Sequence, residues 1–159
     1  MFRWKRPHVE DSFPRVYARF QAKDSESEDL VEYWIQDLPM ERYADAIAFM
    51  THEQYLGEET FAKGKDVLED PEAVEEFSQL YQILLNEKLS IVCFKEGSDE
   101  IVALNILFAL DTSEQDFQLP LKTAPLSEIF NCGKHIMSLS ENFEPKDQFV
   151  LVGFRTFSE

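Results

Sequence analysis

The sequence predicts an α+β, or mixed α/β, fold with a mostly antiparallel twisted sheet and helices packed on it. Two apolar runs, 90–94 and 100–110, flank a short polar segment that contains one glycine, which is typical of a β-hairpin. Residues 71–85 carry apolar side chains at helical spacing. The whole pattern reads strand, strand, helix, helix, hairpin, helix, strand, which places helices between blocks of antiparallel strands.

The hairpin between Ser90 and Leu110 is expected to lie at the centre of the sheet. From Ile101 onward its second arm is apolar, with Asn105 as the one strongly polar interruption. A strand with one wet face alternates apolar and polar residues, so this run predicts a strand covered on both faces. The amide of Asn105 then needs partners, and two hypotheses stay open: a structural hydrogen bond or contact with a ligand.

Two strands are expected before the first helix. Residues 1–12 are predicted to be a loose arm, and residues 13–159 a single domain. Within that domain, residues 13–21 alternate weakly and residues 30–36 are rich in β-forming side chains, which predicts an antiparallel pair. The acidic run 24–29 between them predicts a solvated turn.

Two helices are expected between these strands and the hairpin. Asp37 or Leu38 is placed to cap the first helix, with Pro39 in its first turn. Asp70 is expected to cap the second helix, which Pro71 begins. The side chains of the second helix that are expected to face the core are Val74, Phe77, Tyr81, Leu84 and Leu85.

Two elements are expected after the hairpin. A polar linker, 111–125, leads to an apolar pattern that predicts another helix, although Gly133 weakens it. Residues 149–157 then predict a last strand. The members of the apolar pattern are Leu126, Ile129, Phe130, Ile136 and Met137.

Composition and charge exclude several classes of protein. The 159 residues carry a net charge of -16, and beyond the first six residues they lack the clustered Lys and Arg that bind nucleic acid or anionic membranes. No apolar run reaches the roughly 20 residues that span a bilayer, and the basic N-terminus has no apolar core of a secretory signal. The two cysteines fit no disulfide scaffold. We therefore expect a cytoplasmic protein whose acidity suits amine substrates or serves solubility.

Candidate reactive groups are few. The adjacent carboxylates Glu58 and Glu59 follow a helix, and such a pair can raise one pKa and so supply a general base. Solvated surface charge is the alternative. The three histidines lie far apart and no His-Glu-x-x-His string is present, so no metal site is expected.

Several short strings carry a family resemblance through their order and spacing. They lie at 14–21, 31–39, 55–59, 70–71, 90–94 and 100–105. In that order they resemble the GCN5-related N-acetyltransferase superfamily, and within it the insect arylalkylamine N-acetyltransferase-like group. The resemblance implies a twisted sheet whose central strands splay to admit acetyl-CoA, and transfer of the acetyl group to a primary amine.

The resemblance also implies a catalytic base and an anion-binding loop. In the insect group the base is the Glu of an acidic-Glu-Pro segment, which maps onto Glu59, although Thr60 stands where the family has Pro. The family's pyrophosphate loop, an Arg/Gln-x-x-Gly-x-Gly/Ala string, follows the fourth core strand. Here Arg155 precedes Thr156 and does not begin that string. We therefore assign no cofactor-binding residue, and acetyl-CoA is expected as the cofactor only because of the resemblance.

Three hypotheses about function follow. The first, which needs the fewest assumptions, is an acetyltransferase-like domain that lacks its C-terminal third and is truncated and inactive alone. The second is a non-enzymatic module that binds a small molecule or a protein. The third is half of a composite enzyme completed in trans, with the strand 149–157 offering its edge to a protein partner.

Overall fold

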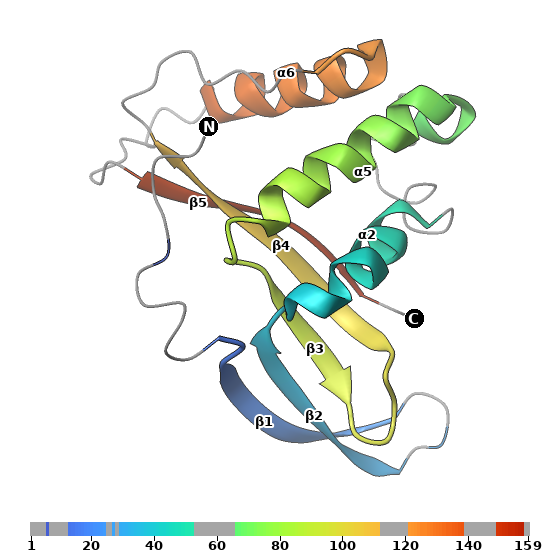
Figure 1. Cartoon of the computed structure of the whole chain (residues 1–159), viewed down its shortest axis with the longest axis vertical. Coiled ribbons are helices and arrows are strands. Elements are labelled where there is room, and N and C mark those ends of the chain that lie inside the picture. The colour runs from blue at the N-terminus through green and yellow to red at the C-terminus, as the bar shows by residue number, and fades with distance from the viewer. Residues whose placement is uncertain are drawn as a thin grey trace.

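The computed structural model describes most of the chain. It describes Arg6, 13–24, Ser27, 29–52, 66–111, 121–138 and 149–157, and for 110–111, 133–138 and 149–157 it describes the backbone alone. Five strands form one sheet in the order of the chain, and each neighbouring pair is antiparallel (Figure 1). The strands are β1 (Val16–Lys23), β2 (Leu30–Asp37), β3 (Ile91–Lys95), β4 (Ile101–Asp111) and β5 (Phe149–Phe157). The α+β class with a mostly antiparallel sheet is confirmed.

The helices pack together on the sheet. They are α2 (Tyr43–Thr51), α5 (Pro71–Leu85) and α6 (Ala124–Ser138), with short 3-10 turns η1 (Met40–Arg42) and η2 (Val67–Glu69). Helix α5 contacts both α2 and α6, and α2 and α5 also contact β4, as Figure 1 shows. Buried side chains of β3 and β4, such as Val92 and Ile106, join those of the helices in one apolar core.

The hairpin from Ser90 to Leu110 is at the centre of the sheet, as predicted. Strand β3 is the middle strand of five and pairs with β4, and Gly97 adopts a φ of 78° in the loop between them. Only glycine tolerates that conformation at little cost. The expectation that the hairpin is covered on both faces is wrong, because buried residues such as Leu104 alternate with half-buried ones such as Asn105. The helices cover one face, and the opposite face of β3 and β4 keeps partial contact with water.

Helix α5 matches its prediction closely. The Asp70 carboxylate accepts hydrogen bonds from the backbone N–H groups of Glu72 (3.0 Å) and Ala73 (3.2 Å), and Pro71 opens the helix. This cap satisfies two amides that have no partner within the helix. The predicted core-facing residues are buried except Val74, which is partly buried, and Ala73 and Leu80 join them.

The start of α2 differs from its prediction. Asp37 is the last residue of β2, and Leu38 donates its N–H to the carbonyl of Ser90 at 3.0 Å, so neither residue caps the helix. Pro39 remains extended, with φ -64° and ψ 145°, and the 3-10 turn η1 separates it from α2. The physical reason is that the Asp37 carboxylate is already bound by other donors, which are described below.

Glu76 joins α5 to the segment that leads into α6. Its carboxylate accepts hydrogen bonds from the backbone N–H of Lys122 and from the N–H and hydroxyl of Thr123, the latter two at 2.9 and 2.5 Å. Partial burial alone raises the pKa of Glu76, but these hydrogen bonds favour its charged form and hold the pKa below its ordinary value of 4.5.

We predict that Asp70→Ala lowers the free energy of unfolding by about 1 kcal/mol, because two helix amides lose their acceptor. Asp70→Asn, which keeps an oxygen acceptor, is the matched control and is expected to stay close to the parent. Urea unfolding followed by circular dichroism measures both. Equal losses in the two variants would contradict the capping role.

We also predict an acid-dependent contribution from Glu76. Since its folded-state pKa lies below the unfolded value, its stabilisation is present above pH 4.5 and is lost as the pH falls through the folded-state pKa. Glu76→Gln should therefore be less stable than the parent at pH 7 and approach it in acid. Glu75→Gln is the control, because it removes a carboxylate from the same helix and leaves the hydrogen bonds of Glu76 with Lys122 and Thr123 in place. Thermal unfolding between pH 7 and pH 3 measures the difference, and a gap that does not change with pH would refute the prediction.

Candidate active site

Glu59, the predicted catalytic base, lies outside the described residues, and so does Glu58. The structure places the two ends of the segment that carries them. Helix α2 ends at Thr51, with Met50 fully buried, and the chain is described again from Asp66, next to the fully buried Val67. Both flanks of the segment are thus held in the core, while the catalytic role of Glu59 stays a prediction.

Two described side chains with acid–base chemistry, Cys93 and Tyr43, have raised pKa values. Burial raises the pKa of the Cys93 thiol, so the reactive thiolate is disfavoured at neutral pH. Burial, and then the charge of Asp37, raises the pKa of Tyr43 to about 12, and its hydroxyl donates to the carbonyl of Leu85 at 2.8 Å. Neither residue is suited to be the base of an acyl transfer.

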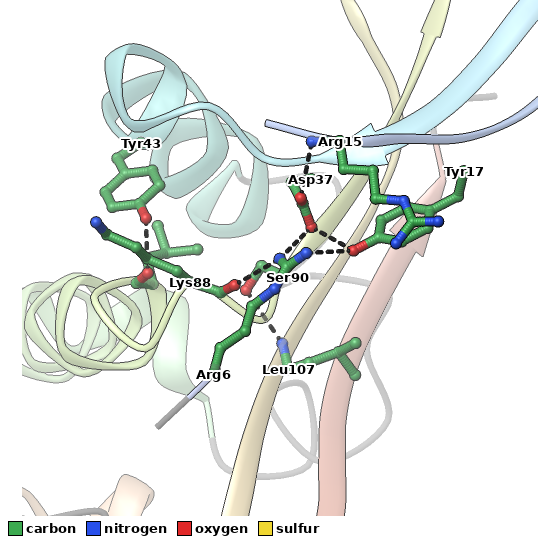
Figure 2. A network of polar contacts seen from close by, with 9 residues as sticks. Arg6, Arg15, Tyr17, Asp37, Tyr43, Lys88, Ser90 and Leu107 are labelled. Atoms are coloured by element: carbon green, nitrogen blue, oxygen red, sulfur yellow. Dashed lines mark hydrogen bonds and ion pairs between the residues drawn. The ribbon is translucent and has the colours of Figure 1, made fainter. Parts of the chain in front are cut away.

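Asp37 is the most deeply buried of the polar residues that the structure describes. Its carboxylate has no exposed surface and sits where β2 ends, and donors converge on it from three sides (Figure 2). Oδ1 accepts from Nη1 of Arg6 at 2.5 Å and from the hydroxyl of Tyr17 at 2.7 Å. Oδ2 accepts from the backbone N–H of Arg15 at 2.8 Å. A buried carboxylate needs such charged and polar donors to offset its loss of hydration.

Local backbone features bring these donors together. The register between β1 and β2 shifts between Val16 and Ala18, so Tyr17 lies in a β-bulge beside the end of β2. Arg6 also donates to the carbonyl of Lys88 at 3.1 Å, and Lys88 has a positive φ of 56° in the turn between α5 and β3. Its Nη2 donates to the Tyr17 hydroxyl at 2.7 Å. We name Arg6, Tyr17, Asp37 and the Lys88 carbonyl the Asp37 cluster.

The Asp37 cluster is an anchor rather than a reaction centre. The hydrogen bond from Arg6 to Asp37 raises the pKa of Arg6, and both carboxylate oxygens of Asp37 accept hydrogen bonds from donors of the chain. Of the predicted loose arm, 1–12, the structure describes Arg6 alone, and at that position the arm is fixed. The sequence did not predict the cluster, because Asp37 before Leu38-Pro39 resembles a helix cap.

Asn105 lies on the face of the sheet that the helices leave open. Its register partners are Ile91 on β3 and Arg155 on β5, and its side chain is half-buried. Within the described part of the chain, the side-chain amide of Asn105 takes part in no hydrogen bond. The hypothesis of a structural hydrogen bond therefore finds no support there, and the hypothesis of a ligand contact stays open.

Two further expectations concern metals and membranes. Within the described residues, no group of three or more His, Cys, Asp or Glu side chains could hold a metal ion. In the same part of the chain, none of the helices has the length and apolarity needed to cross a bilayer.

Comparison with known proteins gives one structural relative. The sequence matches no protein-family model, and it matches no curated protein. The fold is similar to the crystal structure of an insect putative arylalkylamine N-acetyltransferase 7 from the yellow fever mosquito, with a TM-score of 0.84 and 32% sequence identity over 98% of this chain. The chain is therefore arylalkylamine N-acetyltransferase-like. The resemblance predicted from the short strings is confirmed.

The acetyltransferase-like chain spans 65% of the length of that mosquito protein. The matched part contains the five-stranded sheet and its helices, since the match extends over nearly all of the chain. It follows that the Asp37 cluster is part of a sheet end within an acetyltransferase-like fold. The activity itself, with its substrate and cofactor, is a proposal.

We predict that Arg6→Met destabilises the chain by about 3 kcal/mol, because the buried Asp37 loses its cationic partner. Arg19→Met is the matched control: Arg19 pairs with Glu32 at 2.8 Å on the surface, and such exposed pairs contribute below about 1 kcal/mol. Chemical unfolding of both variants measures the difference. Losses of equal size would contradict the anchoring role of Arg6.

Proposed function

We propose that these 159 residues form the amine-side part of an acetyl-CoA-dependent N-acetyltransferase-like protein and that they do not transfer acetyl groups by themselves. The observation that supports this most strongly is the structural likeness to the mosquito acetyltransferase, at 32% identity over 98% of the chain. The reaction class is acyl transfer to a primary amine. Glu59 is the proposed base that accepts the proton of the amine nitrogen.

The charge of the chain fits an amine. Arylalkylamines are cations near neutral pH, and a net charge of -16 attracts cations and raises their concentration near the surface. The proposal includes a cytoplasmic setting, which the free thiols of Cys93 and Cys132 support.

The described residues fit coenzyme A poorly. A helix N-terminus with free amides binds a pyrophosphate, but the first amides of α5 are bound by the carboxylate of Asp70. The amides of Lys122 and Thr123, which lead into α6, are bound by the carboxylate of Glu76. A carboxylate at each position repels an anionic ligand. Moreover, the five glycines of the 159 residues are too scattered to form a glycine-rich loop.

A second candidate function is completion by a partner chain. Strand β5 pairs with β4 on one side and, in the described sheet, lies at the edge. An edge strand offers free N–H and C=O groups to another strand. This geometry supports the hypothesis of a composite enzyme, in which a protein partner supplies the coenzyme-binding groups along β5.

Calorimetric titration of the 159-residue chain with acetyl-CoA tests the first proposal. We expect no micromolar binding, and Glu59→Gln should behave like the parent. Micromolar binding would overturn the claim that these residues alone are inactive. In that case the acetylation rate of tyramine, used as a probe amine, should fall by about 10²–10⁴-fold in Glu59→Gln and stay unchanged in the control Glu58→Gln.

A further inference from the structure

Strand β1 forms the other edge of the sheet, and it is unusually exposed. Seven of its eight residues are exposed, and it pairs with β2 alone within the described chain. It carries three of the large apolar side chains that remain exposed: Val16 (41%), Tyr17 (49%) and Phe20 (43%). A long exposed edge with apolar side chains is a template for pairing with another strand.

The hydrogen-bonding pattern shows which backbone groups of β1 are free. The N–H of Asp24 donates to the carbonyl of its partner Asp29 at 2.8 Å, so these two residues form a hydrogen-bonded pair. Such pairs alternate along an antiparallel ladder, which makes Ala22 and Phe20 hydrogen-bonded to β2 as well. The N–H and C=O groups of Arg19 and Gln21, between them, therefore point away from the sheet.

We propose that β1 pairs antiparallel with β1 of a second copy of this chain, with the two-fold axis at Phe20. This register places Arg19 opposite Gln21 of the second copy and Gln21 opposite Arg19. Phe20 then faces its own counterpart, on the side of the sheet where it already stacks on Tyr33 at 5.6 Å. Aromatic cross-strand pairs of this kind stabilise antiparallel ladders.

The charges of β1 disfavour the neighbouring registers. An axis at Arg19 would set Arg19 against itself. An axis at Gln21 would set Arg19 against Lys23. Like charges directly opposite each other destabilise a ladder, so the axis at Phe20 is the register that avoids both conflicts. The bulge at Tyr17 ends the regular ladder on one side and leaves a stretch, 18–22, that is centred on Phe20.

A second copy suits this edge better than an acidic peptide does. Strand β1 contains no acidic residue, and Arg19 has an ion-pair partner on the neighbouring strand, Glu32, at 2.8 Å. The net charge of -16 opposes an acidic peptide and a second copy alike, so the choice of occupant rests on Phe20, which in a second copy meets its own counterpart across the axis. Two β1 strands bring the least acidic edge of each copy together.

Sedimentation equilibrium of the full 159-residue chain tests the proposal, with folding of every variant checked by circular dichroism. We expect a monomer–dimer equilibrium in the parent. Phe20→Lys should be monomeric, because two lysines then face each other at the axis. Leu30→Lys makes the same change at another exposed apolar residue (68%), on β2, and should still form the dimer. A monomeric parent, or a dimer that survives Phe20→Lys, overturns the proposal.

Introducing a charge at the neutral residue Gln21 tests the register. Gln21→Glu places a carboxylate opposite Arg19 twice in the dimer and should tighten the dissociation constant about fivefold, whereas Gln21→Arg should weaken it by a similar factor. General repulsion between two acidic chains predicts the opposite signs, because Gln21→Glu adds negative charge and Gln21→Arg removes it. Shifts in that opposite direction, or no shift in either variant, overturn the register.

Discussion

Asp37 is a carboxylate with no exposed surface, and its need for partners constrains the whole end of the sheet where it lies. Burying a charge without donors costs far more than a domain can supply from its net stability. The bulge that aims Tyr17, the fixed Arg6 and the left-handed turn at Lys88 each supply or orient a group of this cluster. One buried charge thus links the N-terminal arm, β1, β2 and the turn before β3.

A different demand acts at the helix starts, where backbone N–H groups without a partner in the helix bind carboxylates, and this has consequences for ligands. Asp70 binds the first amides of α5, and Glu76 binds the amides that lead into α6. Both arrangements stabilise the fold, and both occupy the groups that a pyrophosphate would use. If the proposed function holds, the pyrophosphate of acetyl-CoA would bind elsewhere than at these two helix starts. An acidic surface has no such conflict with a cation, which is consistent with the amine substrate that we propose.

The elements predicted well from the sequence are those whose signals are local. Helix α5 was predictable because the cap, the proline and the apolar spacing of its residues all lie within one continuous stretch. Asp37 was misassigned because its side-chain partners are distant in the sequence, from 20 residues away for Tyr17 to 31 residues away for Arg6. The hairpin's covering was overestimated because apolar residues such as Ala103 and Leu107 can remain half-buried on an open face. Composition does not encode which face receives helices.

The cations of edge strand β1 limit the registers in which another strand can pair with it. Strand β1 carries two cations, Arg19 and Lys23, and charged residues commonly protect an edge from unwanted strands. Protection by like charge depends on register, because a residue clashes only with the one directly opposite it. With cations four residues apart, an axis at Phe20 sets each central cation against a neutral side chain. The spacing that disfavours the axes at Arg19 and Gln21 leaves the axis at Phe20 free of like-charge pairs, so these charges favour that register over its two neighbours.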